Sequence, residues 1–163
     1  MHMSDRGVKL LKSIEQLRLV PYDDQTGEPT TRWCKGATIG YGHLILQAEW
    51  PLYKSGITKA EAEELFVRDL APRESTVTRY VRSPLQRHQF DALVILVYHI
   101  GRSNFATSSV VKLLRDPSAD TPYPCLEGAW KAWNKSQGEV NRGLINRRAA
   151  EWRLFTTGAY TRW

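Results

Sequence analysis

The chain is poor in cysteine and contains no long apolar run. Its 163 residues include two cysteines, Cys34 and Cys125, and neither has a second cysteine close by in the sequence. A zinc site is therefore not expected, and two reduced thiols are the default, with Cys34–Cys125 the one internal disulfide open to the chain. The longest apolar run, residues 92–98, is far shorter than the roughly 18 residues of a membrane helix. We expect no stable membrane insertion.

Signals of several other kinds of chemistry are also missing. The chain has no Gly-rich phosphate loop, no serine in a Gly-x-Ser-x-Gly elbow and no internal repeat. Its four histidines, at positions 2, 43, 88 and 99, are not spaced as metal ligands. No charged start precedes an apolar stretch, so we expect no secretory signal, and we treat residues 1–3 as a cloning remnant outside the fold.

The composition indicates one globular domain with a basic surface. Apolar residues make up 42% and charged residues 25%, which excludes wholesale disorder. The length fits a single domain with room for a second lobe. Lys and Arg exceed Asp and Glu by 23 to 17, a net charge of +6. Such a charge attracts nucleic acid, anionic lipid or an acidic cell wall, although it serves solubility equally well.

Local signals predict a helix, a turn-rich β region and then helices to the end. Ser4 caps a first helix that stops before Pro21, which places Glu15 in about its last turn. Residues 21–46 predict one or two antiparallel hairpins. A helix is predicted over residues 59–70, a second from Pro72 to about residue 82, and a further helix start at residues 83–86. Residues 90–100 predict a buried core helix. The remaining helices are predicted over residues 107–115, 125–133 and 143–155, with loops at 116–124 and 134–143.

This order predicts an α+β fold in a single domain. A small β-rich lobe spans about residues 20–56, and a larger, mostly helical lobe takes residues 4–19 and 57–163 with a buried central helix. A groove between two such lobes is a natural ligand site.

Two carboxylates flank the start of the β region. Glu15 lies where the first helix ends, Asp24 follows eight intervening residues later, and Thr38 lies on a later strand. A desolvated carboxyl that keeps its proton, opposite an ionised partner, is what glycoside hydrolysis requires. The same spacing also suits two solvated surface carboxylates.

At these residues the sequence resembles the phage-type lysozymes, the family that includes the lambdoid phage endolysins. That family's pattern is Glu, eight residues, Asp, a short spacer and then Thr-Ile-Gly-x-Gly-His, matched here at 15, 24 and 38–43. The resemblance continues, in order, through residues 61–69, 89–108 and 143–151. One departure is the spacer between Asp24 and Thr38, because residues 25–35, which include Trp33 and Cys34, lengthen it. The resemblance implies a lysozyme-like fold.

The resemblance also implies roles for particular residues. Glu15 is the general acid, Asp24 the second carboxylate, acting as base or nucleophile, and Thr38 positions water or substrate. Asp23 is the rival of Asp24, and the eight-residue spacing favours Asp24. The substrate-binding candidates are Gly42, Leu44, Tyr98 and Ser108, although Tyr98 fits the core equally well. The supporting candidates are His43, which is expected to pair with Asp69, and Arg147 or Arg148, either of which could reach Glu15. Trp130, Trp133 and Trp152 are expected to pack in the core more than to bind sugar.

The implied activity is that of a peptidoglycan muramidase. It would cleave the β-1,4 bond between N-acetylmuramic acid and N-acetylglucosamine, without metal or organic cofactor, as a monomer that binds no nucleic acid. The positive charge would steer it to the anionic wall. The rival hypotheses are an inactive wall-binding module, a basic nucleic-acid-binding domain and a lytic transglycosylase. An endolysin of this kind would stay in the host cytoplasm until a holin admits it to the periplasm, where host cell lysis follows.

Overall fold

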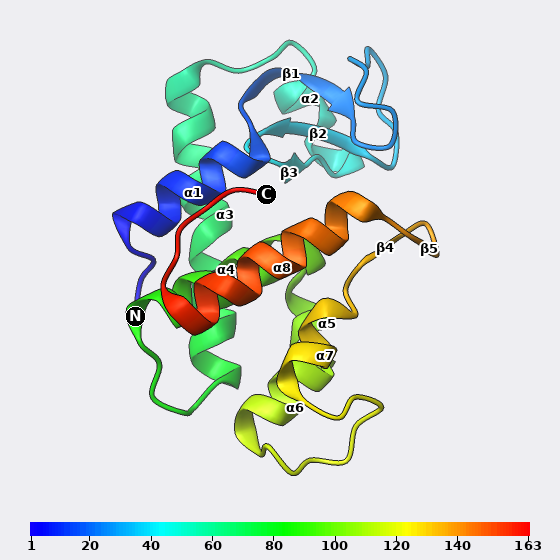
Figure 1. Cartoon of the computed structure of the whole chain (residues 1–163). Coiled ribbons are helices and arrows are strands. Elements are labelled where there is room, and N and C mark those ends of the chain that lie inside the picture. Colours follow the sequence, from blue (N-terminus) through cyan, green and yellow to red (C-terminus); the bar gives the residue numbers. More distant parts are fainter. The chain divides into compact units, whose positions relative to one another are not determined.

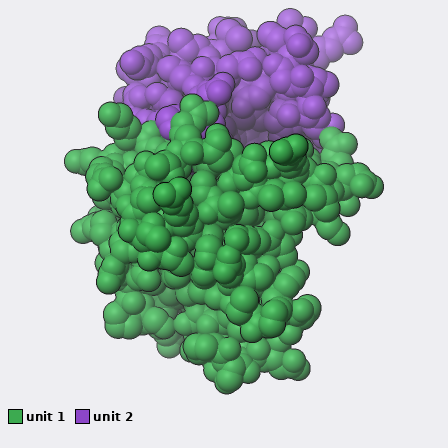
Figure 2. Space-filling model, in the orientation of Figure 1, with its two compact units in different colours: residues 1–10, 72–163 green, residues 11–71 purple.

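The computed structural model describes all residues from Met1 to Trp163 and divides into two compact units. Unit 1 comprises Met1–Leu10 and Pro72–Trp163, and unit 2 comprises Leu11–Ala71 (Figures 1 and 2). Two helices cross the division in sequence: α1 (Asp5–Glu15) between residues 10 and 11, and α3 (Lys59–Tyr80) between residues 71 and 72.

Unit 2 contains a three-stranded antiparallel sheet in the order β1-β2-β3. Its strands are β1 (Arg18–Asp23), β2 (Ala37–Gly40) and β3 (His43–Leu44), followed by a 3₁₀ turn (Gln47–Glu49) and the short helix α2 (Trp50–Tyr53). Tyr22 pairs with Thr38, and Thr38 pairs with Leu44. Ile39, Ile45 and Leu65 form its buried core, so the first turns of α3 pack on this sheet.

Unit 1 is built around the buried helix α4 (Arg87–Ile100), which packs against α8 (Arg142–Thr157). Its other elements are α5 (Arg102–Thr107), α6 (Ser109–Arg115), α7 (Leu126–Lys131) and the two-residue strands β4 (Lys135–Ser136) and β5 (Glu139–Val140). Ten of the fourteen residues of α4 are buried, as expected for a helix with almost no polar face. Gly101 ends it with φ of 87°, a conformation that favours glycine.

Several predicted element boundaries are wrong. Pro72 does not begin a helix, because α3 runs through it. Buried side chains on both sides, Leu70 and Val77, compensate for the roughly 3 kcal/mol that an internal proline costs. The start signal at 83–86 lies outside α4, which is capped by Gln86 instead. By contrast, the first helix ends at Glu15, before Pro21, as predicted, and Pro21 lies in β1.

Other differences concern short elements. The segment predicted as one helix over 107–115 begins at Ser109, and Ser108 separates it from α5. The loop predicted over 134–143 contains the β4–β5 pair, and its last two residues open α8. Elements of two to six residues carry too little periodicity to be recognised in a sequence. By contrast, the capping box at Thr58 and Glu61 is present, with both reciprocal hydrogen bonds.

The extent of the units also differs from the lobes expected from the sequence. The expected β-rich lobe covered residues 20–56, whereas unit 2 extends over Leu11–Ala71, because it includes parts of two helices. Met3, which we set aside as part of a cloning remnant, is buried, and its backbone N–H donates to Glu74 at 2.7 Å. The segment before Ser4 therefore takes part in the packing of unit 1.

Candidate active site

Glu15 is the last residue of α1 and is half-buried in unit 2. The next residue, Gln16, has φ of 56°, a left-handed conformation that turns the chain from the helix towards β1. One turn before Glu15, Lys12 forms an ion pair with Glu63 of α3, and the Tyr41 hydroxyl donates to the same carboxylate at 2.8 Å. These contacts fix the end of α1, and with it the position of Glu15.

Asp24 follows directly after β1, and its position depends on Gly36. The Asp24 backbone N–H donates to the Gly36 carbonyl at 3.0 Å. A Cβ atom at position 36 would overlap Asp24 Oδ1 and come within 2.7 Å of Asp23 Oδ1. The absence of a side chain at Gly36 therefore makes room for both carboxylates.

The two neighbouring aspartates have different surroundings. Asp23 Oδ1 accepts the backbone N–H of Gln25 at 3.0 Å, and the Asp23 carbonyl accepts that of Gly27 at 2.7 Å. Asp23 thus stabilises a local turn, as aspartates commonly do. Burial raises the pKa of the Asp24 carboxyl above its ordinary value, and the negative charge of Asp23 raises it further.

Thr38 is buried in β2, directly opposite Tyr22. Its hydroxyl donates to the Gly36 carbonyl at 2.9 Å, which leaves the oxygen lone pairs as acceptors. A hydroxyl held in this way can accept a hydrogen bond from a water molecule or a sugar hydroxyl.

Tyr22 connects the sequence-predicted residues. Burial raises the pKa of the Tyr22 phenol, the negative charge of Glu15 raises it further and that of Asp24 does so to a smaller extent, while Arg18 lowers it. The Arg18 guanidinium lies 4.3 Å from the centre of the Tyr22 ring. One phenol therefore lies within electrostatic range of both carboxylates and opposite Thr38.

The sequence analysis did not single out Tyr22, which lies within the predicted β region. The signal that could have identified it is the alternation of side chains along a strand, which places residues two apart on one face. Tyr22 precedes Asp24 by two positions, at the end of β1.

The predicted His43–Asp69 pair is present in unit 2. His43 Nδ1 lies 2.9 Å from Asp69 Oδ2, and His43 Nε2 lies 3.4 Å from a Glu49 oxygen. Burial alone would lower the pKa of His43, but the hydrogen bond to Asp69 and the two negative charges outweigh it, so the pKa is raised. Of the neighbouring substrate-binding candidates, Leu44 is half exposed and Gly42 has φ of 79°.

Two further substrate-binding candidates, Tyr98 and Ser108, belong to unit 1 and are both buried. The Tyr98 ring lies 4.3 Å from the Arg73 guanidinium. The Ser108 hydroxyl accepts the Val111 N–H at 3.2 Å and donates to the Phe105 carbonyl at 2.7 Å. Ser108 is therefore the N-cap of α6.

Arg147 and Arg148 belong to a buried polar network in unit 1. Arg147 Nε and Arg148 Nη2 donate to one oxygen of Glu151, at 3.1 and 2.6 Å, and Trp130 Nε1 donates to the other at 3.1 Å. Burial, together with the two arginines, lowers the pKa of His99 to about 3. Trp130 is fully buried against Trp152, as expected of core tryptophans, and Trp133 lines a small hollow beside Ser108.

The long connection between Asp24 and Thr38 folds back on unit 2. Its Trp33 Nε1 donates to the Ile45 carbonyl at 2.9 Å, and Tyr22 forms an isolated bridge with Pro29. Cys34 and Cys125 are both free thiols. No three His, Cys, Asp or Glu side chains gather as a metal site would require, and every helix is too short or too polar to cross a bilayer.

Comparisons with known proteins identify the family of the chain. Residues 12–151 match the family model described as phage lysozyme. The chain is 34% identical over 157 residues to the endolysin of Salmonella phage P22, covering 95% of this chain and 98% of that one, and 35% identical over 158 residues to the endolysin of Bacillus phage PZA. The match to the PZA endolysin covers 97% of this chain but only 56% of the length of the PZA protein.

Solved structures show the same fold. The endolysin from Escherichia coli O157:H7 phage FAHEc1 superposes with a TM-score of 0.78 at 26% identity, covering 99% of this chain and 98% of that one. A crystal structure of a P22 lysozyme mutant superposes with a TM-score of 0.71 at 31% identity, covering 96% and 99%. The α+β architecture is thus the lysozyme fold, and the chain belongs to the phage lysozyme family.

Proposed function

We propose that the chain is a muramidase that hydrolyses the β-1,4 bond between N-acetylmuramic acid and N-acetylglucosamine in peptidoglycan. In this proposal Glu15 is the general acid, Asp24 is the ionised partner and Thr38 orients water. The observation that carries the proposal is that Glu15, at the end of α1, and Asp24, directly after β1, both lie within electrostatic range of the Tyr22 phenol, and that Tyr22 pairs with Thr38. Family membership and the endolysin relatives support the same substrate.

The position of Glu15 suits a proton donor. It ends α1, where the helix dipole disfavours added negative charge, and its side chain is half-buried. In the proposed reaction Glu15 transfers its proton to the glycosidic oxygen as the bond to the anomeric carbon breaks. The departing sugar leaves as an alcohol, and Glu15 becomes a carboxylate.

We assign Asp24 the opposite role. As a base, Asp24 accepts a proton from the water that adds to the anomeric carbon. As a nucleophile, Asp24 forms a glycosyl ester, which water then cleaves while the Glu15 carboxylate accepts the proton of that water. Thr38 can accept a hydrogen bond from that water through its free lone pairs. The reaction needs no metal or organic cofactor.

We further propose that Gly42, Leu44, Tyr98 and Ser108 assist substrate binding, that His43, Asp69 and Arg147 support the site, and that the protein acts as a monomer. Access to the wall would follow opening of the host membrane by a holin, with movement from cytoplasm to periplasm and then host lysis. The net charge of +6 suits an anionic wall as a steering force.

Mass analysis of fragments from digested, purified wall tests the function. The proposal predicts glycan fragments that end in reducing N-acetylmuramic acid, and loss of these fragments with Asp24→Asn. Anhydro-sugar ends that persist with Asp24→Asn would instead identify a lytic transglycosylase. Wall binding with no released fragments would identify a binding module.

A further inference from the structure

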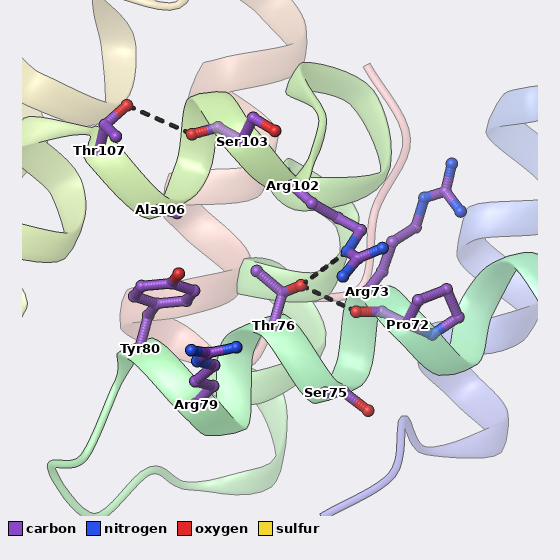
Figure 3. Close-up of a pocket in the computed structure, with 10 residues that line it drawn as sticks. All are labelled: Pro72, Arg73, Ser75, Thr76, Arg79, Tyr80, Arg102, Ser103, Ala106 and Thr107. Atoms are coloured by element: carbon purple, nitrogen blue, oxygen red, sulfur yellow. Dashed lines mark hydrogen bonds between the residues drawn. The ribbon is translucent and has the colours of Figure 1, made fainter.

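Unit 1 carries a hollow of about 790 Å³ between the second half of α3 and α5 (Figure 3). Arg73, Arg79 and Tyr80 of α3 and Arg102 of α5 line it together with four hydroxyl side chains, Pro72 and Ala106, and no Asp or Glu does. A second hollow of about 530 Å³ is lined by Arg82, Ser83 and Arg115. Both hollows therefore combine positive charge with an absence of negative charge.

Tyr80 connects the two hollows. The Arg79 guanidinium lies 5.6 Å and the Arg115 guanidinium 5.9 Å from the centre of its ring. The Arg115 Nε also donates to the Tyr80 carbonyl at 2.9 Å. Four arginines are here called the arginine track: Arg79 in the last turn of α3, Arg82 just after that helix, Arg102 at the start of α5 and Arg115 at the end of α6.

Two members of the arginine track are held by contacts that leave the ends of their side chains available. Arg102 Nε donates to the Thr76 hydroxyl at 3.2 Å, and Thr76 in turn donates to the Pro72 carbonyl at 2.8 Å (Figure 3). Arg115 is held in the same way through its Nε. A guanidinium fixed through Nε can still present its two Nη groups to a carboxylate or phosphate in bidentate fashion.

The surroundings favour a flexible polymer over other polyanions. The exposed large apolar residues of unit 1, which are Met1, Val140, Ile145 and Trp163, line neither hollow, so an apolar anchor for a membrane is missing. The Tyr80 ring is flanked by two arginines and is not an open platform for stacking bases.

We propose that the arginine track is a non-catalytic binding site for oxyanions repeated along the cell-wall polymer. These oxyanions are either the carboxylates of its peptides or the phosphates of polymers attached to it. The inference rests on the proposed function for the choice of polymer, and on the two hollows for the site. Such a site keeps the enzyme on an insoluble substrate between cleavage events.

Co-sedimentation with insoluble walls tests the proposal, using proteins that all carry Glu15→Gln so that the walls stay intact. Arg79→Ala with Arg102→Ala is expected to weaken binding about three- to tenfold, the effect of losing two exposed charge pairs. The control, Arg153→Ala with Arg162→Ala, removes the same charge from exposed positions outside both hollows and is expected to bind as the parent does. Thermal unfolding of each variant checks that it folds.

Chemically altered walls distinguish the two sources. One treatment amidates the carboxyl groups of the wall, and the other removes its phosphate polymers with hydrofluoric acid. The treatment that destroys the bound oxyanions should weaken binding of the parent protein and abolish the difference between the parent and the track variant. That treatment identifies the source of the oxyanions. Equal binding of the track variant and its control would overturn the proposal, as would a difference that survives both treatments. A larger loss on duplex DNA or anionic vesicles than on walls would also overturn it. Wall clearing by the wild type tests the proposed function separately.

Discussion

Among single residues, Tyr22 and Gly36 define the surroundings of the two carboxylates. Tyr22 lies within range of both charges, and Gly36 leaves the space that Asp24 occupies. Neither residue is expected to exchange protons or bonds with substrate. The chemistry of the site therefore depends on neighbours that only position it.

Gly36→Ala should separate positioning from folding. The added methyl group would overlap Asp24 Oδ1 and push the carboxylate away. Since displacements of about 1 Å can cost about a hundredfold in rate, kcat/KM on wall substrate should fall by about that factor, with a smaller effect on the melting temperature. Gly128→Ala is the control, because a Cβ there meets only ordinary contacts at 3.8 Å or more. Full activity of Gly36→Ala would argue against a role for Asp24.

Asp23→Asn should shift the pH profile. The Asp23 charge raises the pKa of Asp24, and asparagine removes that charge while keeping an oxygen for the Gln25 N–H. The acid limb of kcat/KM, where Asp24 takes up a proton, should therefore move to lower pH. An unchanged limb would mean that Asp24 does not control activity at low pH.

At the scale of elements, buried polar groups connect helices that the hydrophobic pattern alone does not orient. In unit 1, Glu151 of α8 accepts hydrogen bonds from Trp130 of α7 and from two arginines of its own helix. Arg148 is fully buried and Glu151 nearly so. Such a network is sensitive to the loss of any one charge.

Glu151→Gln should destabilise the protein strongly. It removes the carboxylate that pairs with the buried guanidinium of Arg148, and removing one partner of a buried ion pair costs about 3–5 kcal/mol. Urea unfolding measures the loss. Glu127→Gln breaks an exposed pair with Lys131 and should cost less than about 1 kcal/mol. Similar losses from the two variants would contradict the account.

In unit 2, the His43–Asp69 pair connects β3 to α3 and should make stability depend on pH. Because the folded state raises the pKa of His43, its contribution is fully present below the unfolded pKa of about 6.5 and is lost as pH rises through the folded pKa. Urea unfolding at pH 6 and pH 8 should show this loss. The Asp69→Asn protein should be less stable than the wild type at pH 6. Its free energy of unfolding should also change less between pH 6 and pH 8. Equal pH dependence in both proteins would exclude the pair as its source.

Much of the fold could be predicted where a signal is long or chemically specific. The apolar stretch around Phe90 identified the core helix, and the capping box at Thr58 located the start of α3. Pro72 misled the prediction, because tertiary packing outweighed a local helix-breaking preference. The short elements β4 and β5 carried no recognisable period.

For the whole molecule, the order of motifs predicted the family and the lysozyme fold, and the comparisons confirm both. The extent of each unit could not be predicted, since it depends on which parts of α1 and α3 pack with which core. The same holds for the arginine track, which arises from contacts between segments distant in sequence. Net charge suggested an anionic partner but could not locate where it binds.

The most direct test of the central claim compares kcat/KM for wall hydrolysis between the wild type and Glu15→Gln. Removing a general acid should lower the rate by about a hundred- to ten-thousandfold. Glu28→Gln makes the same chemical change at an exposed position of the Asp24–Thr38 connection and should leave the rate unchanged. The account predicts a large loss of rate in Glu15→Gln and none in Glu28→Gln, with circular dichroism showing that both variants are folded. A Glu15→Gln protein that keeps more than about a tenth of wild-type activity would contradict the account.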